Sequence, residues 1–117
     1  MRVRLFRQDT IEEFVDNHGN GKKHFIGWLQ TLKYADWEEP GDITFSLKGN
    51  LLGGGSNRVV FDVGGNGRNA FRIICEYKFD CPYNNGVRKV HLYVNWIGTH
   101  EEYNTLSANE KLTVSDY

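Results

Sequence analysis

The sequence has little proline and cysteine and no long apolar segment. Its 117 residues include two prolines, two cysteines and one methionine, and the net charge is −1. Two cysteines are too few for the disulfide framework that stabilises small secreted domains. No run reaches the roughly 18 apolar residues of a membrane-spanning helix, and the start at Met1–Arg4 lacks the apolar stretch of a signal peptide. These absences favour a soluble cytoplasmic protein with no membrane partner.

What the chain does contain is aromatic side chains and charges of both signs. Aromatic residues make up 14% of the chain and charged residues 25%. A folded chain has this composition, whereas a disordered one has fewer apolar residues and a larger charge imbalance. A chain of this length forms one core, so we expect a single domain over residues 1–117.

The N-terminal part predicts a strand and a helical hairpin. Alternation over Arg2–Arg7 predicts a short strand. Asp9 and Glu12 have the spacing of a capping box at the start of a first helix, which ends near Gly19. Apolar residues with helical spacing predict a second helix over Lys22–Ala35.

The middle of the chain is rich in glycine and predicts turns. From Asp36 to Asn57 we expect a loop, in which Ile43–Leu47 forms a brief edge strand. A hairpin signal follows at Asn66-Gly67 and another at Asn85-Gly86, because both residue types tolerate positive φ. Three antiparallel strands are therefore expected after Asn57.

The strand sequences predict which side chains share a face of the sheet. Residues expected on the core face are Phe71, Ile73, Cys75, Tyr77, Phe79, Val90, Leu92, Val94 and Trp96. Because tight hairpins exclude a wholly parallel sheet, the chain is predicted to be an α+β protein of two layers. The helical hairpin covers one face of the sheet, and we expect the other face to be open.

The expected open face gathers cationic and aromatic side chains. A symmetric turn at Asn85-Gly86 predicts four cross-strand pairs: Lys78 with Lys89, Glu76 with His91, Ile74 with Tyr93, and Arg72 with Asn95. This surface is either an ordinary solvated face or a site for phosphodiesters and bases, which bind to cations and rings. The four histidines have no metal-ligand spacing, so no metal or other cofactor is expected.

Several blocks of sequence occur in a recognisable order. The longest is Trp96–Tyr103, which reads Trp-Ile-Gly-Thr-His-Glu-Glu-Tyr. It is preceded by Ala35–Trp37, Asn57–Phe61, Gly64–Asn66 and Phe71–Ile74. With these blocks the chain resembles, from about Trp28 to Tyr103, the HigB toxins of bacterial toxin–antitoxin modules. The resemblance implies a RelE-like fold that ends in a short C-terminal helix.

The resemblance also implies an activity and partners. HigB-type toxins are mRNA interferases, that is, endoribonucleases that cut messenger RNA, typically on the ribosome. They are held inactive by a helix-turn-helix antitoxin of the HigA type, and they meet DNA only through that antitoxin. A metal-free reaction of this kind needs an acid and a base, together with cations for the extra phosphate charge.

Site residues follow from combining this implication with the predicted open face. His100 is the candidate acid or base, because imidazole titrates near neutrality. Arg72 is the candidate phosphate clamp, and Tyr103 orients RNA or stacks on a base. The predicted substrate-binding residues are Lys78, Lys89, His91 and Arg58.

Other readings of these residues stay open at this point. Thr99 and Glu102 have capping-box spacing, so His100 is alternatively the first residue of a last helix. Tyr103 is alternatively a core or antitoxin-contact residue, and Arg72 a member of a strand salt bridge. The low net charge is unusual for a ribosome-acting toxin, because phosphate affinity comes largely from Lys and Arg. A ParE-like toxin that inhibits a protein target and a silent antitoxin-binding module are the alternative functions.

Overall fold

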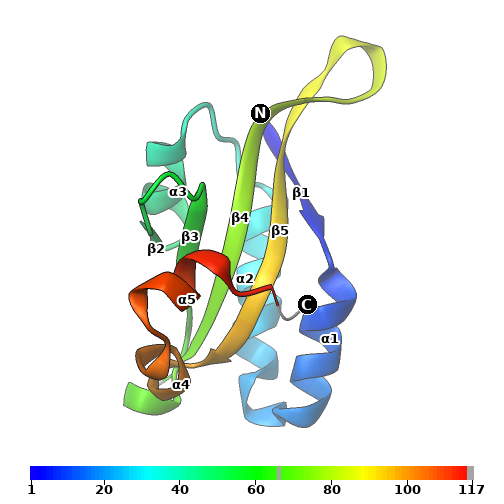
Figure 1. Cartoon of the computed structure of the whole chain (residues 1–117). Coiled ribbons are helices and arrows are strands. Elements are labelled where there is room, and N and C mark those ends of the chain that lie inside the picture. Colours follow the sequence, from blue (N-terminus) through cyan, green and yellow to red (C-terminus); the bar gives the residue numbers. More distant parts are fainter. Residues whose placement is uncertain (66, 116–117) are drawn as a thin grey trace.

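A computed structural model describes residues 1–65 and 67–115, and in it one mixed sheet runs the length of the molecule (Figure 1). The strands are β1 (Arg2–Phe6), β2 (Gly49–Leu51), β3 (Arg58–Gly64), β4 (Phe71–Pro82) and β5 (Arg88–Thr99). Their order across the sheet is β1-β5-β4-β3-β2, and every neighbouring pair is antiparallel except β1 with β5. The predicted α+β class, the N-terminal strand and the three-strand meander are confirmed.

Helices pack on both faces of this sheet. They are α1 (Gln8–Asn17), α2 (Lys22–Lys33), α3 (Pro40–Ser46), α4 (His100–Thr105) and α5 (Ala108–Thr113), with short 3-10 turns at Gly19–Gly21, Gly67–Asn69 and Asn84–Gly86. Residues of α1, α2 and α3 form the main core with one face of the strands. Figure 1 shows α4 and α5, in orange and red, lying across the opposite face. In the described part of the chain, no helix combines the length and apolar character needed to cross a membrane.

Two local predictions for the N-terminal half are wrong. Asp9 does not cap α1, because β1 passes directly into the helix through Arg7, which has a left-handed φ of 68°. Ile43–Leu47 is not a strand: Pro40 occupies the first turn of α3, and the Asp42 carboxylate accepts the backbone N–H of Glu39 at 3.1 Å. Proline and a capping carboxylate both favour a helix start. The edge strand of this region is β2 instead.

The β4–β5 turn forms where it is predicted, but the predicted pairing is wrong. Asn85 and Gly86 have φ of 57° and 77°, as the Asn-Gly signal requires. However, the Tyr83 N–H donates to the Val87 carbonyl at 2.8 Å, so the hairpin closes across three residues. The observed pairs include Lys78 with His91, Glu76 with Tyr93, Ile74 with Trp96, and Arg72 with Gly98. In the other predicted turn, Asn66 lies outside the described residues.

A β-bulge in β5 changes the face that the end of this strand presents. Ile74 lies opposite Trp96 and Cys75 opposite Val94, so Asn95 is an additional residue with no partner on β4. An additional residue reverses the alternation of side chains beyond it. Val94 therefore contacts the main core as predicted, whereas Trp96 points to the other face, contrary to the prediction.

The turned Trp96 creates a second, smaller core. Val60, Ile74, Trp96 and Tyr103 form a buried cluster against which Leu52, Leu106 and Val114 pack. This cluster attaches α4 and α5 to the sheet. The predicted open face is therefore covered at the end of the sheet near α4 and uncovered only toward the β4–β5 turn.

Gly98 makes room for the Trp96 ring, which supplies a first test. A Cβ at Gly98 lies 2.5 Å from the Trp96 ring and 3.2 Å from the Glu102 carboxylate, so Gly98→Ala forces the indole away. We expect this change to lower the free energy of unfolding by about 1–3 kcal/mol, as overpacked sites do, measured by urea denaturation.

Gly27→Ala is the matched control, because a Cβ on this α2 residue meets nothing within 4 Å. The control is expected to stabilise the protein by about 0.5–1 kcal/mol through helix propensity. A Gly98→Ala variant as stable as the parent contradicts the packing described for Trp96.

Candidate functional site

Two of the predicted catalytic residues, Arg72 and Tyr103, meet where β4 passes beneath α4. The guanidinium carbon of Arg72 lies 5.2 Å from the centroid of the Tyr103 ring, in a cation–π arrangement. Arg72 is half-buried, and its buried Nε has no hydrogen-bond partner among the described residues. A partly buried guanidinium with an unused donor is suited to binding an anion, because the guanidinium fork matches two oxygens of a phosphate.

Tyr103 is a packed residue of the second core. Its side chain is 7% exposed, with Trp96 at 6.1 Å between ring centroids and the Lys111 ammonium at 4.4 Å from the ring centre. Burial raises the pKa of the Tyr103 hydroxyl, and the positive charge of Arg72 opposes that shift. The Tyr103 hydroxyl therefore stays protonated at neutral pH. Its packing is that of a core residue, which is one of the alternatives that the sequence leaves open.

His100 is the first residue of α4 and is half-buried. Its backbone N–H donates to the Ala70 carbonyl at 2.6 Å. The capping-box reading is confirmed: Glu102 N–H donates to Thr99 Oγ1 at 3.2 Å, and Thr99 N–H to the Glu102 carboxylate at 2.8 Å. His100 begins the helix on which Tyr103 lies and precedes that residue by about one turn.

Arg58 does not join this group as a free cation. It is 6% exposed, and its Nη1 donates to the carbonyl of Val114 at 2.7 Å and to that of Lys111 at 3.4 Å. Its Nε lies 3.9 Å from the carboxylate of Glu76. These contacts fasten the C-terminal end of α5 to the sheet, so the prediction that Arg58 binds substrate does not fit its position.

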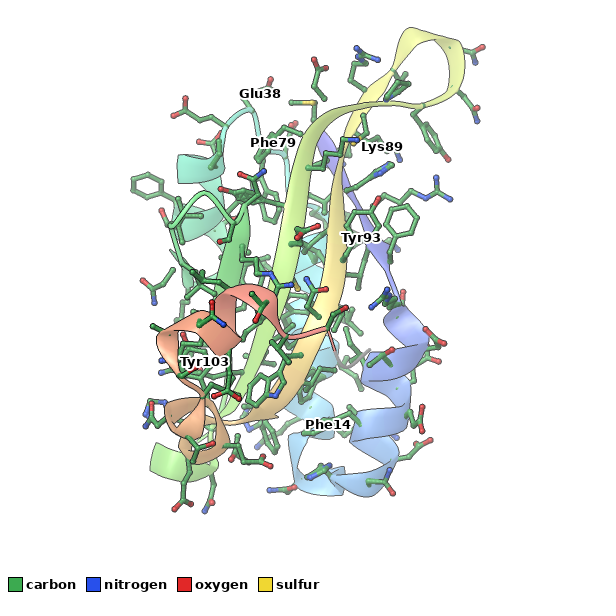
Figure 2. The ribbon with its side chains drawn as sticks, viewed as in Figure 1. Phe14, Glu38, Phe79, Lys89, Tyr93 and Tyr103 are labelled. Carbon is green, nitrogen blue, oxygen red and sulfur yellow. The ribbon has the colours of Figure 1, made fainter. Side chains whose placement is uncertain are left out.

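The remaining predicted residues lie at the other, uncovered end of the same face. There, cations and rings from β1, β4, β5 and the β4–β5 turn form what we call the cationic–aromatic platform, made of Arg4, Phe6, Lys78, Tyr83, Lys89, His91 and Tyr93. Figure 2 shows Lys89 and Tyr93 along β5, well separated from Tyr103 on α4. The predicted site is thus divided into two groups.

His91 lies at the centre of the platform. Its ring centroid is 4.8 Å from that of Phe6, and its Nδ1 is 3.3 Å from the Tyr93 hydroxyl. Within the part of the chain that the structure describes, its buried Nε2 has no hydrogen-bond partner. Burial and the positive charges of Arg4 and Lys78 lower the pKa of His91 from its ordinary value. The His91 imidazole is therefore neutral at neutral pH. One of its two ring nitrogens then carries no proton and can accept one.

Sequence reasoning missed the contribution of β1 and of the turn. Arg4 and Phe6 pair with His91 and Tyr93 through the parallel β1–β5 ladder, and Tyr83 projects from the turn. The alternation of Arg2–Arg7 predicts that Arg4 and Phe6 share a face. Nothing in that short strand, however, indicates which strand it pairs with.

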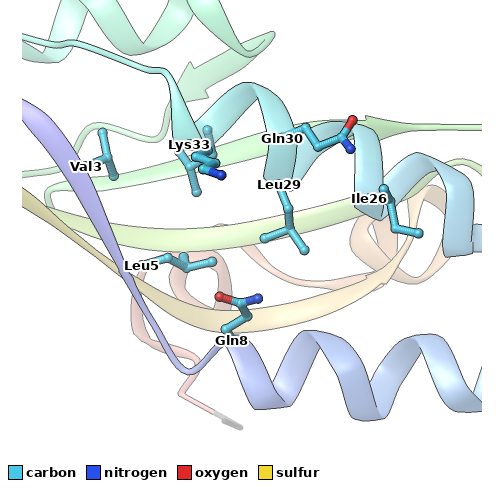
Figure 3. Close-up of a pocket in the computed structure, with 8 residues that line it drawn as sticks. Val3, Leu5, Gln8, Ile26, Leu29, Gln30 and Lys33 are labelled. Carbon is cyan, nitrogen blue, oxygen red and sulfur yellow. The ribbon is translucent and has the colours of Figure 1, made fainter.

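The opposite side of β1 holds an apolar groove without a comparable set of groups. It is lined by Val3 and Leu5 of β1 together with Ile26 and Leu29 of α2, and Lys33 stands at its rim (Figure 3). Across the described residues, no three His, Cys, Asp or Glu side chains gather as metal ligands do. The chemistry-bearing groups are those of the two clusters above, and the expectation of no cofactor stays a prediction.

Comparison with known proteins identifies the family. A family model described as HigB_toxin, the RelE-like toxic component of a toxin–antitoxin system, matches residues 22–106. The match covers most of the chain, and the fold agrees with it, so the chain belongs to the HigB toxin family. Neither the curated proteins nor the solved structures gave a match. The resemblance inferred from the sequence blocks is thereby confirmed.

The anchoring role of Arg58 is tested by comparing two arginines. Arg58→Ala removes a buried donor to α5, and we expect a loss of about 1.5–3 kcal/mol in the free energy of unfolding, measured in urea. Arg88→Ala breaks an exposed ion pair with Asp80, at 3.0 Å, and is expected to cost less than about 1 kcal/mol. Equal losses in the two variants argue against an anchor at Arg58.

The environment of His91 predicts a dependence of stability on pH. With its pKa lowered in the folded state, the unfolded chain binds the proton more readily, so stability is lost as pH falls below the ordinary value of 6.5. His91→Gln removes this contribution, and we expect the variant to lose less stability than the parent on acidification, measured as the shift in urea midpoint above and below pH 6.5. Parallel losses in parent and variant contradict the assignment.

Proposed function

We propose that this toxin is a metal-independent endoribonuclease that cleaves messenger RNA, on the ribosome, and that a HigA-like helix-turn-helix antitoxin holds it inactive. The observation that carries the proposal is the half-buried Arg72 guanidinium against the Tyr103 ring, at the helix that His100 begins. Its buried Nε has no hydrogen-bond partner among the described residues. On the same face, Lys78, Lys89 and His91 supply further cations and an imidazole. Family membership supports the toxin role and the existence of an antitoxin, and the chemistry is inferred from these side chains.

The reaction needs only groups that these residues supply. The 2′-oxygen of RNA attacks the adjacent phosphorus, a bond from phosphorus to the 2′-oxygen forms, and the bond to the 5′-oxygen breaks. A base takes the 2′-hydroxyl proton and an acid returns a proton to the leaving 5′-oxygen. We assign both proton transfers to His100, whose imidazole takes the 2′-hydroxyl proton and then returns a proton to the 5′-oxygen. Stabilisation of the extra phosphate charge is assigned to Arg72. Tyr103 positions the Arg72 guanidinium through its ring.

One observation favours an alternative, the silent antitoxin-binding module. The chain has a net charge of −1, and α5 covers part of the face that holds Arg72. A protein with this charge binds RNA through local clusters of cations or not at all, because phosphate affinity follows the number of Lys and Arg contacts. The activity experiment below separates the two functions, and it also identifies a toxin that acts on a protein target.

Expression of the chain is expected to arrest growth and to produce mapped cuts in messenger RNA. Arg72→Gln and His100→Gln should each lower cleavage about a hundredfold in a cell-free translation extract, as loss of a charge-stabilising or proton-transferring group does. Primer extension maps the cuts. His24→Gln, at a half-buried histidine of α2, is the control and should cleave like the parent.

The outcomes separate the three functions. Cuts that disappear in Arg72→Gln and His100→Gln but persist in His24→Gln support the nuclease. Growth arrest with intact transcripts and damaged DNA indicates a toxin that acts on a protein target. Normal growth on expression indicates the silent module, and full cleavage in both site variants refutes the assignment of Arg72 and His100.

A further inference from the structure

The platform has stacked aromatic rings, and over residues 1–65 and 67–115 no helix covers them. The rings of Phe6 and Tyr93 lie 4.7 Å apart between centroids and are inclined by only 18°. Both side chains are half-buried, and Tyr83 beside them is 43% exposed. Rings left in contact with water on a soluble protein mark a surface that binds something flat and apolar.

Cations stand directly against these rings. The guanidinium carbon of Arg4 is 4.9 Å from the centre of the Phe6 ring and 5.8 Å from that of Tyr83. The Lys89 ammonium is 4.2 Å from the centre of the Tyr83 ring. A ligand that fits this surface therefore presents flat rings and negative charges at short, alternating intervals, as a nucleic-acid strand does.

The position of the platform relates it to the proposed cleavage centre. Gly98 of β5 lies opposite Arg72. Tyr93 is five positions earlier on the same strand, which corresponds to about 15 Å. Both face the same side of the sheet. A strand of RNA with its cleaved phosphate at Arg72 reaches the platform several nucleotides away, so contacts made there do not touch the reacting atoms.

We propose that the cationic–aromatic platform is a binding site for single-stranded RNA, in which unpaired bases stack on Phe6, Tyr93 and Tyr83 while Arg4, Lys78 and Lys89 contact phosphates. The inference rests on the proposed function for its choice of RNA, and it adds a second contact region distant from the cut. Arg4 and Phe6 belong to β1, which lies outside the residues that match the family model. Stacking requires free base faces, so paired RNA is excluded.

A non-cleavable probe tests the platform apart from catalysis. The probe is a fluorescein-labelled decamer of 2′-O-methyl RNA, which has no free 2′-hydroxyl, and binding is measured by fluorescence anisotropy. Phe6→Leu and Tyr83→Leu each remove one stacking ring and are expected to weaken binding about tenfold. Tyr83 is exposed, so its variant keeps the test decisive if Phe6→Leu unfolds, which circular dichroism detects.

Tyr34→Leu is the matched control. Tyr34 is 68% exposed and also has two cations against its ring, Arg2 at 5.9 Å and Lys33 at 5.8 Å, but it follows α2 and lies outside the platform. This variant should bind the decamer like the parent. A duplex of the same sequence should bind the parent more weakly than the single strand does.

Each outcome bears on the platform or on the nuclease separately. Parent-like binding by a folded Tyr83→Leu variant, an equal loss in Tyr34→Leu, or equal affinity for the duplex overturns the platform. Arg72→Gln should lose cleavage and still bind the decamer. A parent protein that binds the decamer through the platform but cuts no RNA refutes the nuclease and leaves the platform standing.

Discussion

The additional residue at Asn95 determines how the outer face of the sheet is divided. By reversing the alternation of β5, it sends Trp96 to the face that the main core does not use. The Trp96 ring then gives α4 and α5 an apolar surface to pack on, through Tyr103. Before the bulge, β5 keeps its earlier alternation, and His91 and Tyr93 stay uncovered by helices. One local irregularity thus produces a covered half with Arg72 and an open half with rings and cations.

The two halves have different electrostatic character. In the covered half, Nη1 of Arg58 donates to the carbonyls of Lys111 and Val114, whereas the Arg72 guanidinium lies against the Tyr103 ring. The buried Nε of each arginine has no hydrogen-bond partner among the described residues. In the open half, burial and the positive charges of Arg4 and Lys78 lower the pKa of His91. Since charges beyond about 8 Å are largely screened at physiological salt, the proposed contact with RNA depends on these local groups more than on the net charge of −1.

Much of the architecture is predictable from the sequence, and the exceptions have physical causes. Periodicity identifies both main helices and the meander because each segment is long relative to its period. The helix at Pro40–Ser46 and the pairing of β1 escape prediction, because short segments carry too little pattern. The predicted register fails because the hairpin closes across three residues and because the ladder shifts between Lys78 and Cys81 and again at Asn95. None of these irregularities leaves a signal in the alternation. Sequence blocks identify the family and make His100 a candidate residue, but the burial of Arg58 depends on where α5 packs.

The central claim is that RNA contacts the uncovered half of this divided face. The most direct measurement is the change in backbone amide chemical shifts when the 2′-O-methyl decamer is added to isotopically labelled protein. The account predicts changes concentrated in β1, in Lys78 and its neighbours, and in the first half of β5 through Tyr93. Changes confined to α2 and α3, on the opposite face of the sheet, contradict it.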